Sequence, residues 1–401
     1  MRGLRVARVA GIEIRVDASL LIVFALITAG LGGRLFPTWH PDWSPTLAWG
    51  TALVAAVLFF VSVLLHELAH AVVGRLHGIP IRTITLFIFG GMAHLEKQPA
   101  GWRAELLMAL AGPAASLAIG LTMLTLVALL GQPMEVDPAS PAASLAALGP
   151  LATLAVWLGP INIVLAVFNL VPGFPLDGGR VLRALVWGLT GDLLRATRIA
   201  STMGQAFAWL LMASGVAMML GLRLPLLGTG GLNGLWLAFI GWFLNNAAVL
   251  GYRQLLVEQT LGRLTVREVM DTSVRSVDPG LSVEALVESV LLHGPQRGFP
   301  VVRDDRLVGI VCLEDVRRVP RDQWSLTPVA SAMTRAEALV TATPQMSVAE
   351  ALERLSTRGV DQLPVVDREG RVLGLVRREN ILTWITLHAD AESSRGHAPA
   401  R

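Results

Sequence analysis

The sequence predicts a polytopic α-helical membrane domain followed by a soluble α/β region, with the boundary near Tyr252. Two observations support this fold class. Of 401 residues, 53% are hydrophobic and 16% are charged, and most of the apolar excess lies before Tyr252. After Tyr252 the sequence becomes more polar, and two stretches of it resemble each other. The chain therefore contains at least two structural units.

The membrane domain is expected to cross the bilayer six times. Its apolar stretches are long enough to span about 30 Å of hydrocarbon. The first follows three arginines but has no clear cleavage site, so we interpret it as a retained span rather than a signal peptide. The six stretches are Ala18–Gly33, Leu47–Leu65, Leu106–Gly131, Leu145–Val171, Ile199–Leu222 and Leu232–Leu250.

Positive charges cluster in alternate loops of the predicted domain. They precede the first span and lie between spans two and three and between spans four and five, whereas the other loops carry few. The positive-inside rule therefore places both termini in the cytoplasm. The clustered residues are Arg2, Arg5, Arg8, Arg75, Arg82, Lys97, Arg103, Arg180, Arg183, Arg195 and Arg198.

Composition restricts the kinds of site and partner. Cys312 is the sole cysteine, which excludes a disulfide framework and a cysteine-rich zinc site. Any metal must therefore be held by His, Asp or Glu. The net charge of +3 suits contact with anionic membrane lipid, and no basic run with interleaved aromatic residues indicates nucleic-acid binding.

The second apolar stretch runs into the sequence His66-Glu-Leu-Ala-His70. Residues four apart lie on one face of a helix, so both imidazoles can reach one Zn²⁺. Glu67 then lies beside the metal, where it can take a proton from water that the metal activates. Buried polar groups in a membrane helix also need a partner or a function. The pattern predicts a catalytic zinc with Glu67 as general base.

A catalytic zinc takes a third protein ligand. His77 and His94 are near in sequence, but both are expected at the membrane surface. Asp177 is the better candidate, because it follows a span broken by prolines and precedes Gly178 and Gly179, which allow close backbone packing. Spans two and four cross the membrane in the same direction, so the three ligands would meet at one depth near the cytoplasmic side.

These residues resemble the signatures of the site-2 proteases, intramembrane zinc metalloproteases that cut transmembrane helices of other proteins. The resemblance covers about residues 5–252. It rests on the His66–His70 run and on three further matches, Asn169 with Pro172 and Pro175, Asp177-Gly-Gly, and Ala111–Ser116.

The resemblance implies zinc ligands His66, His70 and Asp177, general base Glu67, and Asn169 near the reacting carbonyl. It implies single-span membrane substrates, such as an anti-sigma factor or a remnant signal peptide, and a bacterial plasma membrane location. An Asn in a bundle can instead bridge two helices.

A protease that cuts a helix must bind its substrate in an extended form. The sequence Ile81–Phe89 is rich in β-branched and aromatic residues and ends at Gly90-Gly91, which predicts a membrane-associated β-hairpin. We expect its edge to pair with the unwound substrate. Proline at Thr83 or Thr85 should then slow cleavage without removing zinc. A short interfacial helix is the alternative.

The soluble region contains an internal repeat. Phe299-Pro300-Val-Val is echoed by Leu363-Pro364-Val-Val, an offset of 64 residues. Each unit predicts a helix, two strands and a closing helix, and the repeat resembles a tandem pair of CBS domains. The predicted divisions are a protease domain 1–252, a linker 253–263, CBS units 264–320 and 327–387, and a disordered tail 388–401.

CBS pairs often bind adenine nucleotides between their two units. Asp315 keeps the position of the family's ribose-binding Asp, but Cys312, Arg377 and Asn380 depart from the pattern. The module is therefore expected to bind a nucleotide through Asp315 or to serve as a structural or homodimerising unit.

Two other functions remain open at this point. A CBS-regulated transporter would explain the tail and the intramembrane His and Asp residues, but not Glu67 inside the His pair. An inactive relative that binds membrane helices would not need the complete ligand set. The sequence favours the protease.

Overall fold

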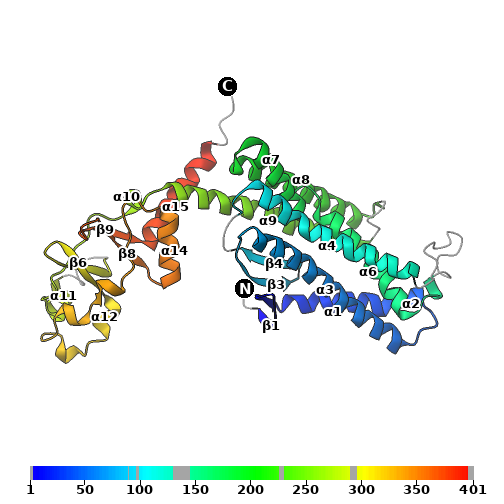
Figure 1. Ribbon diagram of the computed structural model, residues 1–401, viewed down its shortest axis with the longest axis horizontal. Coiled ribbons are helices and arrows are strands. Elements are labelled where there is room, and N and C mark those ends of the chain that lie inside the picture. The colour runs from blue at the N-terminus through cyan, green and yellow to red at the C-terminus, as the bar shows by residue number, and fades with distance from the viewer. Residues whose placement is uncertain are drawn as a thin grey trace, which may run out of the picture. The chain divides into compact units, whose positions relative to one another are not determined.

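The computed structural model describes residues 3–88, 90–95, 99–129, 145–224, 230–289 and 296–395. The chain divides into two compact units, residues Met1–Arg253 and Gln254–Arg401. Figure 1 shows long helices in the first unit, from blue to green, and short helices and strands in the second, from yellow to red. Each unit is described separately below.

The first unit begins with a four-stranded sheet rather than an isolated hairpin. Alternating apolar and charged residues form β1 and β2, which are joined by a tight turn with positive φ at Ala10 and Gly11. The strand predicted at residues 81–89 is present as β3, and β4 completes the predicted hairpin, but Gly90 and Gly91 begin β4 instead of forming the turn. The strands are β1 Leu4–Val9, β2 Ile12–Val16, β3 Ile81–Phe87 and β4 Gly90–Leu95.

The strand order is β1-β2-β3-β4, with β2 parallel to β3 and the other pairs antiparallel. This order shows which strand of the predicted hairpin carries the edge. Thr83 and Thr85 of β3 pair with Glu13 and Arg15 of β2 as well as with β4, so β3 offers no free edge. Among the described residues, β4 is the outer strand on that side of the sheet.

One face of this sheet packs on the helical bundle. Ile12, Ile14, Ile84 and Leu86 are buried there together with Val63. Arg75, at the end of the same helix as Val63, donates hydrogen bonds to the carbonyls of Ala10 and Ile81. The sheet is therefore attached to the helix that carries the His66–His70 run.

Within the part of the chain that the structure describes, six helical segments are long and apolar enough to cross a membrane, as predicted. The first is built from α1 Ser19–Gly30, a π-helical turn Leu31–Leu35 and α2 Phe36–Trp39. The others are α3 Pro45–Leu76, α4 Trp102–Leu129, α6 Pro150–Asn169, α8 Leu193–Met219 and α9 Gly231–Arg263. The protein is thus a multi-pass membrane protein.

Small residues let these helices approach closely. A Cβ at Gly120 of α4 would overlap the carbonyl oxygen of Gly159 and the side chain of Ile163, both on α6. Backbone contact of this kind lets membrane helices associate by packing alone, because lipid offers little hydrophobic driving force. α4 lies between α3 and α6 and is placed to contact the functional residues of α3 (Figure 1).

Between α6 and α8 the chain forms a proline-containing loop and an amphipathic helix, α7 Asp177–Thr190. Gly178 and Gly179 lie against the loop's own backbone at residues 170–174, where a Cβ would overlap it. The loop also reaches α8, since the Phe174 N–H donates to the carbonyl of Ala200 at 3.1 Å. The start of α7 is therefore held from two sides.

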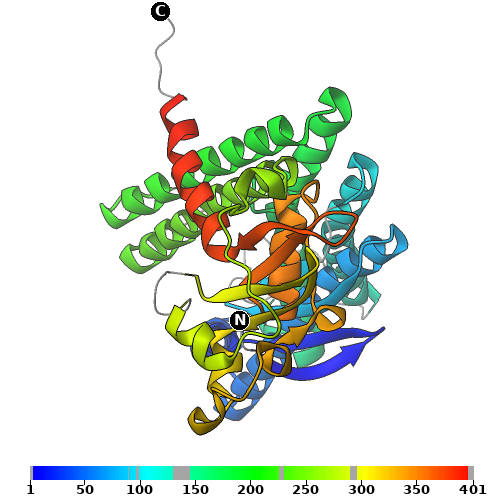
Figure 2. The same cartoon turned by 90° about the vertical axis from the view of Figure 1, so that its left-hand side faces the viewer.

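The second unit contains two repeats of a helix, two strands and a closing helix, as the internal repeat of the sequence predicted (Figure 2). Its first core includes Phe299 and Val311, and its second includes Leu363 and Val376. Its elements are α10 Val266–Val269, α11 Val283–Ser289, β5 Gly298–Arg303, β6 Arg306–Cys312, α12 Leu313–Arg317, α13 Val329–Ala332, β7 Thr334–Arg335, α14 Val348–Arg358, β8 Gln362–Val366, β9 Val372–Arg377 and α15 Arg378–Arg395.

Two segments differ from the sequence-based expectation. Residues 253–263, expected as a linker, are helical and form the end of α9, with Leu255 and Leu261 buried. Residues 388–395, expected to be disordered, continue α15. A polar composition is compatible with a helix that extends beyond its packed turns, and composition alone does not show where such a helix ends.

Candidate metal centre

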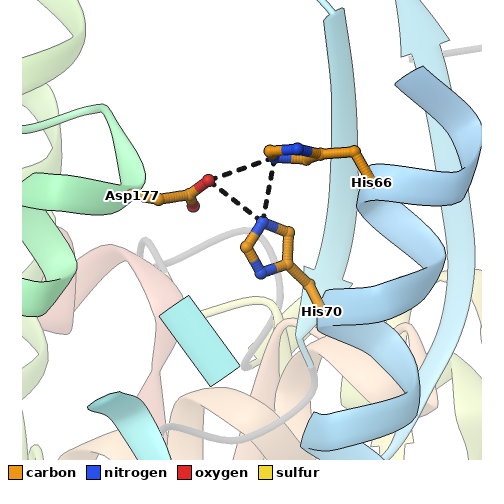
Figure 3. Close-up of side chains that lie close together, drawn as sticks. All are labelled: His66, His70 and Asp177. Carbon is orange, nitrogen blue, oxygen red and sulfur yellow. Dashed lines mark hydrogen bonds and ion pairs between the residues drawn. The ribbon is translucent and has the colours of Figure 1, made fainter. Parts of the chain in front are cut away.

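Helix α3 brings His66 and His70 to the same face, one turn apart. Both are buried, with 4% and 5% of their surface exposed, although the neighbouring Leu65 is 45% exposed. The imidazole rings are nearly perpendicular, at 80°, with centroids 4.8 Å apart. Their Nε2 atoms point to a common place, where Asp177 from α7 meets them (Figure 3).

Three donor atoms form an almost equilateral triangle. The Nε2 atoms of His66 and His70 are 3.2 Å apart, and each lies 3.1 Å from Oδ2 of Asp177. In a tetrahedral zinc site with bonds of about 2.0–2.2 Å, ligand atoms lie about 3.4 Å apart. The triangle therefore fits a zinc ion within a few tenths of an ångström. Among the described residues it is the one group of this kind.

The opposite ring nitrogens fix the chemistry of this triangle. Nδ1 of His70 is 2.6 Å from the carbonyl oxygen of Met108, which can only accept, so Nδ1 carries a proton, and in the neutral imidazole Nε2 then offers its lone pair. Nδ1 of His66 is 2.9 Å from the Ser116 hydroxyl, which can accept in the same way. Three lone-pair donors then converge, and a bound cation relieves their repulsion.

Glu67 lies beside this triangle and outside it. The backbone of β4 passes close to it, since a Cβ at Gly91 would overlap the Glu67 side chain. On the α4 side, a Cβ at Gly112 would overlap Nε2 of both histidines. Only glycine fits at these two positions, so the backbones of β4 and α4 lie directly against the glutamate and the ligand atoms.

Asp177 reaches the histidines because it begins α7. It is the first residue of the helix, directly after the proline-containing loop, and its side chain is 13% exposed. The close packing of Gly178 and Gly179 against that loop leaves no room for larger residues. The sequence-based placement of Asp177 opposite His66 and His70 agrees with this geometry.

The other candidate residues do not join the triangle. The Asn169 amide donates to the carbonyl of Leu165 in its own helix at 3.0 Å and makes no described contact with the three ligand atoms. His77 follows the end of α3, and its Nδ1 bonds the Val73 carbonyl oxygen. His94 belongs to β4, but its side chain lies outside the described part of the structure.

Comparisons with known proteins assign the family. The model described as peptidase family M50 matches residues 54–211. Two relatives carry the name "Putative zinc metalloprotease": sll0528 of Synechocystis is 33% identical over 389 residues, 96% of each chain, and Rip3 of Mycobacterium tuberculosis is 31% identical over 386 residues, 96% of this chain and 93% of the relative. The chain belongs to peptidase family M50.

One further relative and one solved structure are also similar to the chain. Zinc metalloprotease MJ0392 of Methanocaldococcus jannaschii is 26% identical over 387 residues, 96% of each chain. The solved site-2 protease of the same organism covers 62% of this chain and 94% of its own, with 27% identity and a TM-score of 0.42. The CBS domain model matches residues 266–322 and 329–387. The predicted enzyme class and the tandem CBS pair are confirmed.

The CBS module of this M50 protein contains a cavity of about 1080 Å³ that is open to solvent on one side. Asp315 lines it and is 8% exposed, with Oδ2 accepting from the Cys312 backbone N–H at 2.9 Å. Oδ1 lies 3.5 Å from the guanidinium of Arg318. Arginines on several elements also line the cavity, namely Arg297, Arg318, Arg358, Arg377 and Arg378.

Ser116 is a site residue to which the sequence assigned no role. It belongs to the Ala111–Ser116 stretch that supported the family resemblance, and it is completely buried. A buried hydroxyl in an apolar span requires a hydrogen-bond partner, which was the available signal. The identity of that partner, His66, depends on how α4 packs against α3.

Proposed function

We propose that this M50 metalloprotease hydrolyses a peptide bond in or near the transmembrane helix of a single-span membrane protein. His66, His70 and Asp177 hold one catalytic zinc, and Glu67 is the general base. The observation that carries the proposal is the buried triangle of three donor atoms between α3 and α7. It lies within a unit made of helices long enough to cross a membrane.

The bound Zn²⁺ supplies Lewis acidity, which activates water and polarises the scissile carbonyl. Glu67 takes the proton from the attacking water and delivers it to the leaving amine. The packed walls of α3 and α4 exclude bulk water, so charge interactions inside the site are strong. We propose that the Asn169 amide gives up its hydrogen bond to the Leu165 carbonyl and donates to the substrate carbonyl instead.

Strand β4 is the element proposed to present the substrate. It is an outer strand of the sheet among the described residues, and Gly91 places its backbone directly against Glu67. An unwound substrate segment that pairs with β4 would lie beside the general base. β4 is therefore the strand of the predicted hairpin that we propose as its substrate-pairing edge.

We further propose a bacterial plasma membrane location with both termini and the active site toward the cytoplasm. The distribution of arginines supports this orientation. The substrate would be a membrane protein such as an anti-sigma factor or a remnant signal peptide.

The CBS module is proposed to bind an adenine nucleotide or to pair two chains. The arginine-lined cavity suits a phosphorylated ligand, and Asp315 lies at its wall. Calorimetry with ATP, AMP and S-adenosylmethionine tests this proposal on the full chain. Heat with any one of them that is lost in Asp315→Ala supports a nucleotide site, and absence of heat favours the pairing role.

The protease proposal is tested by reconstituting the full chain with single-span peptides. Glu67→Gln should abolish cleavage while the zinc content stays at that of the wild type, because Glu67 is not a ligand. Glu13→Gln is the matched control, since it removes a carboxylate from an exposed ion pair of the sheet. Cleavage that persists in Glu67→Gln would exclude Glu67 as the base.

A further inference from the structure

A buried ion cluster joins α4 to α7 outside the metal triangle. Glu105, in the first turn of α4, is completely buried. Both Nε and Nη2 of Arg183 donate to its Oε1, the first at 2.6 Å. Nε of Arg180 lies 4.0 Å from the same oxygen. The other oxygen, Oε2, has no partner among the described residues.

Stability alone gives a poor reason for this cluster. Burying a carboxylate and a guanidinium costs several kcal/mol for each ion, and apolar residues of similar size are often as stable. An ion pair instead contributes directional contacts. Because the guanidinium of Arg183 is planar, its bonds to Glu105 constrain the angle between α4 and α7. The angle between α4 and α7 in turn affects the positions of the three ligand atoms.

On the α4 side, the cluster shares its helix with the hydrogen-bond partners of both histidines. The Met108 carbonyl, one turn beyond Glu105, accepts from Nδ1 of His70, and Ser116 contacts Nδ1 of His66. Helix α4 therefore determines how both rings are turned. A shift of its first turn would move the Met108 carbonyl and change the direction of the His70 lone pair.

On the α7 side, the cluster shares its helix with Asp177. Arg183 lies less than two turns after Asp177, and its guanidinium carbon is 5.0 Å from the centroid of the Phe174 ring. Phe174 belongs to the loop that packs against Gly179 at the start of α7. Arg183 thus contacts both α4 and the loop that positions the Asp177 carboxylate.

We propose that Glu105 and Arg183 are positioning residues for the metal centre, acting through Asp177. Their ion pair sets α7 at the distance from α4 that lets Oδ2 of Asp177 meet both Nε2 atoms. The proposal rests on the proposed zinc ligands and adds two residues that do not touch the metal. Removing the pair should therefore change metal binding as well as activity.

The test measures zinc affinity of the purified full chain by chelator competition and the visible absorption of its Co²⁺ form. Glu105→Gln should weaken zinc binding by about ten- to 100-fold, the usual range for partners of metal ligands. It should also change the Co²⁺ absorption intensity, which reports coordination. Wild-type affinity and spectrum in Glu105→Gln would overturn the proposal.

A double variant separates positioning from folding. Glu105→Met with Arg183→Met removes both charges and keeps the volume, so the thermal stability should approach that of the wild type. Zinc affinity should remain reduced, because the directional link is absent. If Glu105→Gln does not fold, this variant carries the measurement, and wild-type zinc affinity in it would equally overturn the proposal.

Asp177→Asn distinguishes the inference from the proposed metal site. It should weaken zinc binding strongly, and adding Glu105→Gln should then cost little more, because both changes act on one ligand. Wild-type affinity in Asp177→Asn would reject the metal site itself. If the losses of zinc affinity caused by Asp177→Asn and by Glu105→Gln are additive, Glu105 does not act through Asp177, and that part of the proposal is overturned. Glu350→Gln, which removes an exposed ion pair with Arg354, is the control and should change nothing.

Discussion

Gly112 of α4 leaves no room for a side chain beside the metal triangle. A Cβ at this position would overlap Nε2 of both His66 and His70. Gly112→Ala should therefore lower zinc content and abolish cleavage, since α4 cannot move away without losing the Met108 and Ser116 contacts. Zinc analysis and peptide cleavage check the prediction.

The control for this substitution is Gly50→Ala. Gly50 is also helical, in α3, and an added Cβ there would meet nothing within 4 Å. This variant should match the wild type or gain slightly, because Ala loses less backbone entropy in a helix. Normal zinc content in Gly112→Ala would mean that the metal lies elsewhere.

Cys312 provides a pH-dependent prediction in the CBS module. Burial, together with the nearby Asp315 carboxylate, raises the pKa of the thiol to about 11. A raised pKa favours the thiol form in the folded state, so this stabilisation is complete below the unfolded pKa of about 8.5 and is lost as pH rises through about 11. Alkylation by iodoacetamide should be slow at pH 7.5 and still increase up to about pH 11.

The reaction of Cys312 can also report on the cavity. Cys312 is one of the lining residues, so a ligand that fills the cavity should slow alkylation further. Alkylation that levels off near pH 8.5 would contradict the buried environment. The wild-type chain is suitable without modification, because it contains no other cysteine.

The site residues that could be predicted from sequence are those whose geometry depends on a short spacing along the chain. His66 and His70 share a helix face whatever surrounds them, and Gly-Gly after Asp177 indicates close backbone packing. Ser116, Glu105 and Arg183 could not be assigned in this way. Their partners come from other helices, and their contacts depend on packing that local sequence does not encode.

At the scale of elements, proline substitution in β4 can test substrate pairing, whereas proline substitution in β3 cannot. Consecutive residues of a strand direct their N–H groups to opposite sides, so one of Met92 and Ala93 faces β3 and the other faces outward. Proline removes the N–H. Of Met92→Pro and Ala93→Pro, one should destabilise the sheet, whereas the other should leave it folded and slow cleavage.

Thermal unfolding and peptide cleavage, measured on both variants with zinc content as control, check this prediction. Thr85→Pro is expected to behave like the destabilising one, because β3 pairs with strands on both sides. Equal cleavage by both β4 variants and the wild type would rule out substrate pairing with β4.

The elements that sequence reasoning missed are short and carry charges. β1 and β2 alternate apolar and charged residues around an Ala10-Gly11 turn, which is a strand pattern, but their arginines were interpreted only as a signal for membrane orientation. Helix α7 was likewise not expected, since its amphipathic pattern follows two prolines. Long apolar spans were found readily because composition alone identifies them.

At the scale of the whole molecule, the metal should stabilise one unit and not the other. Zinc that binds only the folded first unit stabilises it by about 4 kcal/mol at 1,000 times its dissociation constant. Chelation should therefore lower the melting temperature of the membrane unit and leave that of the CBS unit unchanged. Calorimetry with and without 1,10-phenanthroline checks this.

Restored zinc should reverse the change, and Glu67→Gln should respond like the wild type because it keeps all three ligands. A shift of the CBS transition alone would place the metal in the second unit. The two-unit organisation itself could be predicted from sequence, since hydropathy and an internal repeat extend over long segments. The continuation of α9 through residues 253–263 could not, because a polar helix resembles a linker in composition.

The length of β4 sets a requirement on the substrate. Six residues, Gly90–Leu95, span about 20 Å when extended, whereas six residues of a helix span about 9 Å. Unwinding a substrate along β4 therefore lengthens that segment by about 11 Å, and one of its flanks must move by this amount. Folded domains anchored on both sides of the bilayer would resist such a displacement, so substrates with one short, free flank should be cut most readily.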